Sequence, residues 1–489
     1  MRLSELLEDI TIIKSNISLE IEIECIANDH RRIKNRSVFV ALRGTKRNGN
    51  DYINDAIKNG AAAIVSDDFA KCKMDIPYVL VANAREALAK MWSNFYKNPA
   101  KEIKTVAITG TNGKTSCAYF LYNILREAKI KCGLISTIEC LINDEKIEST
   151  GGGSILDVSA AMTTPDPEYL FNVYNIMKKR GVQVAVIEAS SHALSQGRLF
   201  PIDIEIAAFT NLTQEHLDFH GDMEEYFKAK KSLFDKCKKG IVNIDDTYGN
   251  RLKNQFEGVV GYSKNEKADF YATDIKCSSK GCEYMLNFNG EKIKMKTQMI
   301  GEFSVYNTLL AAGCAKMLGI ENIVIQKGIS NTVRIKGRME KYKDRNIYID
   351  YAHTPAAMEK IIRTVRQIEP QKRLYVMFGC GGDRDKSKRK EMGKISTSLA
   401  DLTVITADNS RTEPVNSIIA DILEGVNEEK KHIIIPDRRE AIKFIASKLE
   451  NDVVILLLGK GHEEYEIINN LKNRFSEKEI LDEVFVLDK

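Results

Sequence analysis

Short apolar runs alternate with helical patterns along most of the chain. The runs are β-rich and end in glycine, polar or acidic residues. This alternation is typical of an α/β protein with a largely parallel sheet. The predicted strands lie at residues 106–109, 182–187, 204–209 and 241–244, and again at residues 347–349, 374–378, 403–406, 433–435 and 453–458.

The predicted strands fall into two blocks, and a polar segment precedes each block. Residues 96–102 precede the first block, and residues 334–345, which are polar and basic, precede the second. Both segments are interpreted as linkers. A chain of 489 residues is also too long for one compact core. We therefore expect three domains, at residues 1–98, 99–335 and 336–489.

The composition is that of an ordinary folded protein, with 43% hydrophobic and 29% charged residues. The formal net charge of +4 comes from 72 basic and 68 acidic residues that are dispersed along the chain, so we expect no nucleic-acid partner. The run KSKRK at residues 386–390 is interpreted as a solvated face. The longest apolar stretches are far shorter than the roughly 20 residues that span a bilayer. We expect no membrane segment.

The ten cysteines form no CxxC pair and no cluster with histidine at metal spacing. We expect them to be reduced thiols of a cytosolic protein. The chain starts MRLSELLEDITIIK, with acidic residues where an export signal has a basic flank and an apolar run. The sequence therefore predicts a cytoplasmic location.

A phosphate-binding loop is predicted after the strand at residues 106–109. It reads GTNGKTS at residues 110–116, and a helical pattern follows. Glycines let backbone N–H groups close around phosphate oxygens, and the helix N-terminus adds partial positive charge. Lys114 is placed to meet the β- and γ-phosphates and Thr115 to ligate Mg²⁺. The loop is shorter than GxxxxGK, because Ile108 stands where the first glycine would be. Its strand–loop–helix context favours nucleotide binding over a structural turn.

Two other strand ends of the first block carry candidate metal ligands. Glu188 follows the strand at residues 182–187, and His216 follows the strand at residues 204–209. A carboxylate and an imidazole at adjacent strand ends are able to ligate Mg²⁺, although imidazole is a second-choice ligand for so hard a cation. For His216 alone, the residues favour a loop or packing role.

Three strand ends of the second block bring charged side chains to one crevice, because ligands of open parallel sheets bind outside the carboxyl ends of the strands. Arg384, the segment DNSR at residues 408–411 and the segment GKGHE at residues 459–463 each follow a predicted strand. Two guanidiniums and two carboxylates match an amino acid, which has its own ammonium and carboxylate groups. Any one of these segments alone is also typical of a surface charge network.

Ten motifs in a fixed order resemble those of the Mur ligases, and within that family those of the UDP-N-acetylmuramoyl-tripeptide synthetases. The resemblance covers essentially the whole chain. It implies an N-terminal UDP-sugar-binding domain, a central P-loop-type ATPase domain and a C-terminal Rossmann-like domain that brings the amino acid and closes on the other two. The motifs are GTNGKTS at 110–116, TTPDP at 163–167, EASSHALSQGR at 188–198, NLTQEHLDFHGDMEEYFKAK at 211–230, YNTLLAA at 306–312, GRME at 337–340, DYAHTP at 350–355, GCGGDRDKSKR at 379–389, DNSRTEP at 408–414 and GKGHE at 459–463.

The resemblance also implies the catalytic, metal and nucleotide residues. Lys230 matches the lysine that the family carries as an N-carboxylated side chain. A free ammonium beside Mg²⁺ would be repelled, whereas the carbamate formed with CO₂ is an anion. The residues themselves do not distinguish Lys230 from Lys228 or Lys231. The implied metal ligands are Thr115, Glu188, His216 and carboxylated Lys230; the catalytic set is Lys114, Glu188, His216, Lys230 and Arg338; and the ATP-binding set is Gly110, Thr111, Asn112, Gly113, Lys114, Thr115, Ser116, Asn307, Arg338, Asp350 and His353.

The binding residues for the other two substrates follow from the same resemblance. Arg411 matches the arginine that holds the distal carboxylate in members that add diaminopimelate, although the proline of their DNPR motif is Ser410 here. The implied contacts of the UDP-N-acetylmuramoyl-dipeptide are His30, Thr45, Lys46, Arg47, Thr163, Thr164, Ser190, Gln196 and Arg198, and those of diaminopimelate are Arg384, Asp408, Asn409, Ser410, Arg411, Gly459 and Glu463.

The activity implied is that of a monomeric, ADP-forming ligase of peptidoglycan precursor synthesis. ATP with Mg²⁺ would phosphorylate the D-glutamate γ-carboxylate of UDP-N-acetylmuramoyl-L-alanyl-D-glutamate, and the amine of meso-diaminopimelate would attack the acyl phosphate. L-Lysine and LL-diaminopimelate stay open as the added amino acid. The alternatives are a folylpolyglutamate synthetase or sibling Mur ligase, a P-loop NTPase switch or motor, and a non-catalytic binding module. Intact Lys114, Glu188 and Lys230 argue against the last of these.

Overall fold

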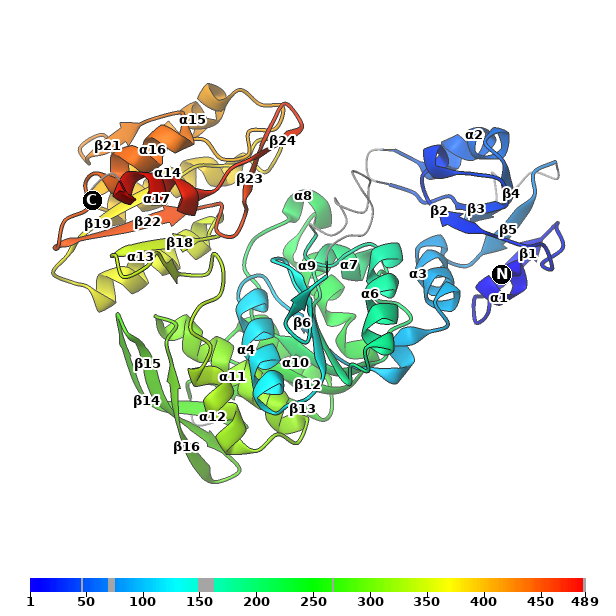
Figure 1. Ribbon diagram of the computed structural model, residues 1–489, viewed down its shortest axis with the longest axis horizontal. Coiled ribbons are helices and arrows are strands. Elements are labelled where there is room, and N and C mark those ends of the chain that lie inside the picture. The colour runs from blue at the N-terminus through cyan, green and yellow to red at the C-terminus, as the bar shows by residue number, and fades with distance from the viewer. Residues whose placement is uncertain (45–46, 69–74, 148–161, 266–267, 487–489) are drawn as a thin grey trace. The chain divides into compact units, whose positions relative to one another are not determined.

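The computed structural model describes residues 1–44, 47–68, 75–147, 162–265 and 268–486 (Figure 1). The chain forms two compact units. One consists of residues 1–109, 130–207 and 228–240, and the other of residues 110–129, 208–227 and 241–489. Across the described residues, no helix combines the length and the apolar composition that a membrane crossing requires.

The N-terminal sheet has five strands, which are parallel except for the first. Its elements are α1 (Leu3–Leu6), β1 (Ile12–Ser15), β2 (Cys25–Ala27), η1 (His30–Arg32), β3 (Ser37–Val40), η2 (Gly49–Tyr52), α2 (Ile53–Lys58), β4 (Ala61–Ser66), β5 (Tyr78–Val81) and α3 (Ala84–Phe95), and the strand order is β1-β5-β4-β3-β2. Phe39, Ile64 and Tyr78 form its core with α2. Helix α3 begins where the Asn83 side chain accepts two backbone N–H groups, as N-cap residues do.

The central sheet is mixed and has eleven strands in the order β16-β15-β14-β13-β12-β11-β6-β10-β7-β8-β9. The strands are β6 (Lys104–Thr109), β7 (Cys132–Ile135), β8 (Cys140–Ile142), β9 (Glu145–Lys146), β10 (Val184–Glu188), β11 (Ile204–Phe209), β12 (Cys237–Asn243), β13 (Val259–Ser263), β14 (Phe270–Ser278), β15 (Gly281–Phe288) and β16 (Glu291–Thr297). Strand β16 lies at one edge of the sheet. Exposed Lys292, Lys294 and Lys296 alternate with buried Ile293 and Met295 along it, a pattern that discourages pairing with another chain.

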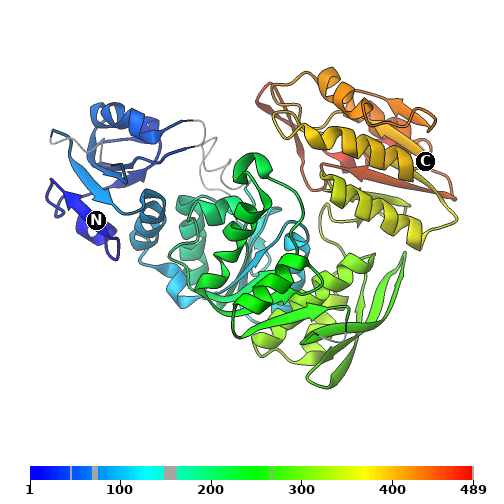
Figure 2. The same ribbon diagram turned by 180° about the vertical axis from the view of Figure 1, so that it is seen from behind.

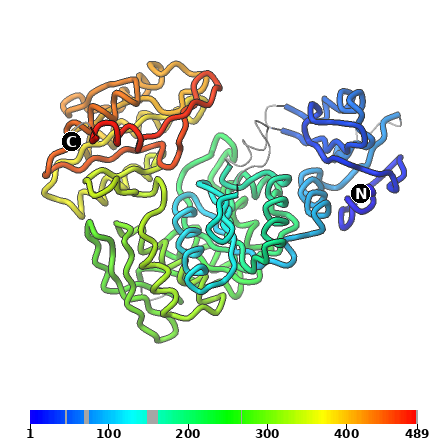
Figure 3. The backbone as a smooth tube through the Cα atoms, viewed as in Figure 1, coloured from blue at the N-terminus to red at the C-terminus, as the bar shows by residue number. Residues whose placement is uncertain are grey.

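Helices of the central region include the one that follows the predicted phosphate loop. Their bounds are η4 (Pro99–Glu102), α4 (Lys114–Glu127), α6 (Pro167–Lys179), α7 (Ser191–Ser195), α8 (Leu217–His220), α9 (Met223–Lys231), η5 (Phe234–Lys236), α10 (Thr247–Gln255), α11 (Glu302–Met317) and α12 (Asn322–Ser330). The chain path through the green β14–β16 segment into α11 and α12 can be followed in Figure 3.

The C-terminal sheet has six strands in the order β17-β18-β22-β19-β20-β21, and all but β17 run parallel. Its elements are β17 (Glu340–Lys341), β18 (Ile347–Asp350), α13 (Pro355–Ile368), β19 (Arg373–Phe378), α14 (Ser387–Leu399), β20 (Leu402–Ile405), α15 (Val415–Leu423), β21 (His432–Ile434), α16 (Arg438–Ala446), β22 (Val453–Leu458), the hairpin β23 (Tyr465–Ile468) with β24 (Leu471–Arg474), and α17 (Glu477–Val486).

Helices cover both faces of this C-terminal sheet. Helices α13, α14 and α15 pack on one face, and α16 and α17 pack on the other (Figure 2). Strand β22 is therefore buried on both sides, which explains why residues 453–458 are continuously apolar rather than alternating. The carboxyl ends of β19, β20 and β22 lead into the three segments that carry the predicted amino-acid site.

The predicted α/β architecture is confirmed, and all nine predicted strands are present. The interpretation of residues 334–345 as a linker is wrong in part, because Glu340 and Lys341 form β17 and pair with Ile349 and Tyr348. Glu340 is buried and accepts the N–H of Gly337. A short edge strand of polar residues has no apolar pattern that would mark it in the sequence.

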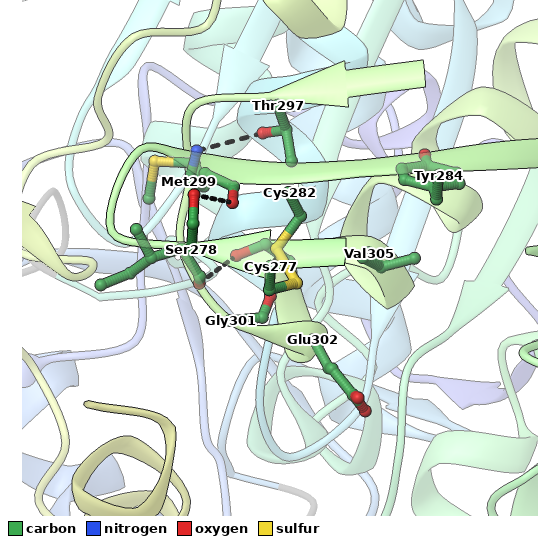
Figure 4. Close-up of a disulfide and its surroundings, with 12 residues drawn as sticks. Cys277, Ser278, Cys282, Tyr284, Thr297, Met299, Gly301, Glu302 and Val305 are labelled. Carbon is green, nitrogen blue, oxygen red and sulfur yellow. Dashed lines mark hydrogen bonds between the residues drawn. A yellow bond between two sulfur atoms is a disulfide. The ribbon is translucent and has the colours of Figure 1, made fainter. Parts of the chain in front are cut away.

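Cys277 and Cys282 form a disulfide, so the prediction that all ten cysteines are reduced is wrong for this pair (Figure 4). The hairpin between β14 and β15 turns so tightly that the two residues lie directly opposite each other, with Cα atoms 4.1 Å apart. Such close approach is usual for facing residues of an antiparallel pair. Sequence spacing alone does not reveal that register. Cys72 lies outside the described residues.

We expect Cys277 and Cys282 to resist alkylation in denaturant until a reductant is added, as read by peptide mass. Because the disulfide closes only a short loop, replacing both residues with serine is expected to lower the free energy of unfolding by at most about 2 kcal/mol in urea melts. Cys25→Ser, at a half-buried free thiol, serves as the control. Labelling of both cysteines without reductant would contradict the disulfide.

Candidate functional site

The segment after β6 has the geometry of a phosphate cradle. Gly110 and Gly113 have φ angles of +141° and +88°, and Gly113 is the N-cap of α4. A Cβ at Gly113 would lie 2.6 Å from Asn307 Oδ1, and a Cβ at Gly110 would lie 1.9 Å from Thr210 Oγ1. Both positions therefore require glycine. The backbone N–H groups at the start of α4 and their partial positive charge suit an anion such as the phosphates of ATP.

Side chains of the following loop hold this segment in place. Asn211 Oδ1 accepts the N–H of Asn112 at 3.0 Å, and Asn211 and Thr210 both donate to the Asn112 carbonyl. Thr111 lies within hydrogen-bond distance of the Tyr226 hydroxyl. The Lys114 ammonium donates to the carbonyls of Gly110 and Thr111 at 2.8 and 2.7 Å. Thr210 and Asn211 are functional positions that the sequence reasoning missed, although they stand at the end of a predicted strand.

Predicted nucleotide contacts from three separate motifs meet at this loop. Arg338 donates to Thr115 Oγ1 at 3.0 Å and lies over the ring of Tyr351. Asn307 is buried, and the Cys117 thiol donates to its Oδ1. The loop thus brings together a predicted metal ligand, a cation and an amide.

Asp350 orders the segment that follows β18. The two carboxylate oxygens of Asp350 accept the N–H groups of Met339 and Ala352. Burial raises the pKa of Asp350, although Arg338 and these two N–H groups oppose the rise. Asp350 therefore has a clear role in fixing the backbone beside Arg338. Its predicted contact with ATP stays a prediction.

Glu215 is a second residue that the sequence reasoning missed. Its carboxylate lies 3.3 Å from His353 Nε2 and 3.8 Å from His216 Nε2. Burial opposes its ionisation, but the hydrogen bond of His353 and the charges of His216, His353 and Lys114 hold the pKa of Glu215 well below its usual range. In the sequence, the only feature that pointed to Glu215 is its place next to His216, a predicted metal ligand. Glu215 links His216 to the DYAHTP segment.

The other compact unit gathers the predicted dipeptide contacts at the end of β10. Glu188 is fully buried, and its carboxylate accepts the N–H and the hydroxyl of Thr137 at 2.9 and 3.0 Å. The hydroxyl oxygens of Thr137 and Thr163 lie 3.1 Å apart, so Thr163 donates to Thr137 while Thr137 donates to Glu188. Thr164 donates to the Glu188 carbonyl at 2.7 Å and accepts the Ser190 N–H. Thr137, which the sequence reasoning missed, joins the predicted threonines to the predicted metal ligand.

Arg198 extends this cluster. Its guanidinium donates to the Thr164 carbonyl at 2.7 Å and to Gln196 Oε1 at 2.7 Å, and it lies 3.1 Å from Asp166. Burial lowers the pKa of Arg198, and Asp166 opposes that shift. Five predicted positions, Thr163, Thr164, Ser190, Gln196 and Arg198, therefore lie in one hydrogen-bonded group.

The predicted uridine-nucleotide contacts are less concentrated. His30 stacks on Tyr52, with ring centroids 4.5 Å apart, and Arg47 is exposed. Thr45 and Lys46 lie outside the described residues. Arg32, which the sequence reasoning missed, donates to both carboxylate oxygens of Glu168 at 2.7 and 2.8 Å. This bidentate pair ties the predicted uridine segment to the helix that follows TTPDP.

Lys230 stands apart from the lysines beside it. It is 1% exposed, whereas Lys228 is exposed and Lys231 is half-buried. Lys230 therefore does not lie on a solvated face of the helix. The predicted carboxylation of Lys230 stays a prediction. Among the described residues, no three His, Cys, Asp or Glu side chains gather into a metal cluster, and the assignment of Mg²⁺ to Thr115, Glu188, His216 and Lys230 stays a prediction.

The predicted amino-acid residues of the C-terminal sheet do meet. Asn409 donates to Glu463 Oε2 at 2.8 Å, and the guanidinium of Arg411 donates to the carbonyls of Gly382 and Asn409. A Cβ at Gly459 would lie 2.7 Å from Asp408 Oδ2. Burial lowers the pKa of Arg411, and the charge of Arg384 lowers it further. Two guanidiniums, two carboxylates and one amide thus share a small volume. Buried Ser410 lies between Asn409 and Arg411 in the same segment.

Two buried arginines fix the segments behind this site. Arg438 is 3% exposed; it donates to the carbonyls of Ala407 and Leu458, which precede Asp408 and Gly459, and it pairs with Glu477. Arg389 is fully buried, so the interpretation of residues 386–390 as a solvated face is wrong at this position. Arg389 donates to the Gly381 carbonyl and to Glu413 and Asp421, and it thereby joins GCGGDR to DNSRTEP. Its hydrogen bonds bring the pKa of Glu413 to about 2.

Comparisons with known proteins match the whole chain. The sequence models of the Mur ligase family catalytic domain, the Mur ligase middle domain and the Mur ligase glutamate ligase domain match residues 22–96, 108–315 and 337–461. The UDP-N-acetylmuramoyl-L-alanyl-D-glutamate--2,6-diaminopimelate ligases of Caldanaerobacter subterraneus subsp. tengcongensis and Clostridium tetani are 40% and 38% identical, each over 99% of both chains. A solved structure with the same ligase name has a TM-score of 0.69 and 26% identity, covering 100% of this chain and 99% of its own.

We expect Arg389→Met to lower the free energy of unfolding by roughly 3–5 kcal/mol, because it leaves Glu413 and the Gly381 carbonyl without their buried donor. Lys390→Met, at the exposed neighbour whose distance to Glu424 is 3.9 Å, is the matched control and should change stability by less than about 0.5 kcal/mol. Urea unfolding of both variants measures the difference. Equal stability of the two variants would show that the Arg389 network contributes nothing.

Proposed function

Because the chain belongs to the Mur ligase family, we propose that it is an ATP-dependent ligase that adds meso-2,6-diaminopimelate to UDP-N-acetylmuramoyl-L-alanyl-D-glutamate in peptidoglycan precursor synthesis. The observation that carries this proposal is the 40% identity, over 99% of both chains, with a ligase named for 2,6-diaminopimelate. Three clusters of predicted binding residues, at the phosphate loop, at the end of β10 and in the C-terminal sheet, support it independently. Among the parts of this proposal, the identity of the added amino acid depends most directly on the side chains of this chain.

Phosphoryl transfer from ATP would take place at the GTNGKTS loop. The N–H groups at the start of α4 would bind the phosphates, and the Lys114 ammonium and the Arg338 guanidinium are placed to neutralise charge as the γ-phosphoryl group leaves. Mg²⁺, when bound, would screen the phosphate charges and help to orient the transferring group. The acceptor is the D-glutamate γ-carboxylate, and the product is an acyl phosphate.

The dipeptide carrying that carboxylate would be held by the Thr164–Ser190–Arg198 group. The guanidinium of Arg198 is oriented by Gln196 and the Thr164 carbonyl, so it presents a fixed cation to a carboxylate or phosphate. Fixing the carboxylate in place contributes to the rate because the two reacting groups then meet in one orientation.

The incoming amino acid would lie against the ends of β19, β20 and β22. Arg411 and Arg384 would bind carboxylates, and Asp408 and Glu463 would accept hydrogen bonds from ammonium groups. Diaminopimelate has one more carboxylate than lysine, and a pair of adjacent guanidiniums favours the substrate with more negative charge. The amine at the L centre would then attack the acyl phosphate to form the amide, with release of phosphate.

The remaining parts of the proposal come from the sequence and its resemblance to the family. They comprise the Mg²⁺ ligands, the carbamate on Lys230, a monomeric state, a cytoplasmic location and domain boundaries near residues 98 and 335. Burial of Lys230 supports the carbamate, and the beginning of the matched middle-domain segment at residue 108 is compatible with the first boundary.

Phosphate release with ATP, Mg²⁺ and UDP-N-acetylmuramoyl-L-alanyl-D-glutamate tests the proposed reaction. We expect turnover with meso-diaminopimelate, and little with LL-diaminopimelate, L-lysine or no amino acid, with product mass confirming the new amide. Preference for L-lysine would contradict the proposed role of Arg411 in binding the distal carboxylate of diaminopimelate. Hydrolysis that does not depend on an amino acid, and yields no amide, would favour an NTPase instead.

Lys230→Ala is expected to reduce turnover severely, because the position would lose its carbamate, and bicarbonate or short carboxylic acids should restore part of the activity. Lys228→Ala is the control, since Lys228 is exposed on the same helix. In the wild-type enzyme, equilibration with isotopically labelled bicarbonate should give a carbamate signal by carbon NMR that Lys230→Ala lacks. Full activity of Lys230→Ala would remove the carbamate from the mechanism.

A further inference from the structure

Lys460 is a buried cation in the middle of the predicted amino-acid site. It is 1% exposed and stands in the GKGHE segment directly after Gly459. The sequence reasoning assigned Gly459 and Glu463 to the substrate and passed over the lysine between them. Its signal in the sequence was weak because a lysine after a glycine is usually a solvated side chain.

The Lys460 ammonium is surrounded by oxygen atoms. It donates to Asn409 Oδ1 at 3.0 Å and to the Tyr465 carbonyl at 2.8 Å. Carboxylate oxygens of Asp408 and Glu463 lie 3.6 and 3.9 Å from it. These partners come from the DNSR segment, the GKGHE segment and the β23–β24 hairpin. One side chain therefore connects three parts of the site.

The contact with Lys460 decides how the Asn409 amide is oriented. A lysine ammonium only donates, so it must face the amide oxygen. The same oxygen accepts the N–H of Ile467 at 2.9 Å, and the amide nitrogen consequently faces Glu463, to which it donates at 2.8 Å. The Tyr465 hydroxyl donates to the other Glu463 oxygen at 3.2 Å. Lys460 and the Ile467 N–H thus fix the Asn409 oxygen together, and the Asn409 nitrogen in turn binds Glu463.

Lys460 also supplies the positive charge between two carboxylates. Asp408 and Glu463 side chains are only 9% and 11% exposed, and like charges in such surroundings disfavour each other. Burial and the Asp408 charge raise the pKa of Glu463, whereas Lys460 opposes that rise. Burial also acts against ionisation of Asp408, but Lys460 and Arg438 lower its pKa. The other charged or titratable groups that face this pair are Arg411, Tyr351, His353 and Tyr465, and Arg384 faces Arg411.

We propose that Lys460 is a positioning residue for the amino-acid substrate, because it orients Asn409 and supplies the buried positive charge between Asp408 and Glu463. This inference rests on the proposed function, in which those two carboxylates receive the ammonium groups of an amino acid. Lys460 itself does not need to touch the substrate. It acts through the three residues that do.

Steady-state kinetics of Lys460→Met test this role, since methionine keeps most of the length and loses the charge. We expect KM for meso-diaminopimelate to rise about 30-fold or more, as when one partner of a buried charge pair is truncated. KM for ATP and for the UDP-sugar dipeptide should stay within about twofold, because these substrates do not contact the Asn409 group. Lys472→Met is the matched control. It removes an exposed cation from the β23–β24 hairpin, 4.1 Å from the Tyr465 ring centroid.

The pH profile separates the charge effect from a purely structural one. Without Lys460 the pKa of Glu463 should rise further, and a protonated carboxyl no longer accepts from an ammonium. The ratio of KM between Lys460→Met and wild type should therefore fall as the pH is raised from about 6 to about 8. Lys460→Gln, which keeps a donor but no charge, should show a smaller rise in KM and the same trend with pH.

Three outcomes would overturn the inference. One is an unchanged KM for diaminopimelate in Lys460→Met. The second is a parallel rise of all three KM values together with a lowered thermal midpoint, which would show only a loss of folding. The third applies if Lys460→Met does not fold, and it is a Lys460→Gln variant whose KM for diaminopimelate and pH profile equal those of the wild type. Failure of the wild-type enzyme to use diaminopimelate would instead refute the proposed function, so the two failures are distinguishable.

Discussion

A buried positive charge is stable only when oxygen atoms surround it, and the C-terminal sheet uses this constraint to fix its loops. Arg389 binds the Gly381 carbonyl, Arg438 binds the carbonyls of Ala407 and Leu458, and Lys460 binds Asn409 and the Tyr465 carbonyl. Each cation thus reaches a segment that follows a parallel strand. Removing one partner of such a group costs far more than a surface ion pair contributes. Residues that do not contact the substrate can therefore hold in place the side chains that are predicted to bind it.

The phosphate loop is fixed in a different way, because backbone rather than charge is the limiting element there. Gly110 and Gly113 allow Thr210 and Asn307 to approach the loop more closely than any side chain would permit. Asn211 then binds the N–H and the carbonyl of Asn112. The cations Lys114 and Arg338 also bind this loop, through the carbonyls of Gly110 and Thr111 and through Thr115 Oγ1. The two sites thus differ: glycines and neutral polar groups fix the backbone of the phosphate loop, whereas buried cations fix the segments of the amino-acid pocket.

Patterns that depend on local burial were readable from the sequence, and patterns that depend on register were not. The apolar run at residues 453–458 predicted a strand of a largely parallel sheet, and the structure shows why the run is continuous, since both faces of the strand are buried. The motifs likewise placed Thr164, Ser190 and Arg198 in one set, and the structure joins them by hydrogen bonds. By contrast, Cys277 faces Cys282 only because of one tight turn. Glu215 and Thr137 lay beside predicted ligands, but their partners come from distant segments that no local pattern reveals.

The burial of charged residues was the hardest property to predict from the sequence, because residues of the same type lie in opposite environments. Arg389 and Lys390 are neighbours in one basic run, yet the first is fully buried and the second is exposed. Lys230 and Lys460 are both 1% exposed, and each must meet the cost of burying an ammonium. For Lys460 the surrounding oxygens of Asn409, Asp408 and Glu463 meet it. Lys230 also interacts with its surroundings, and the proposed reaction with CO₂ would convert its cation into an anion. Burial alone therefore does not distinguish a lysine that is held by acceptors from one that is modified, because only the charges of the neighbouring groups differ between the two cases.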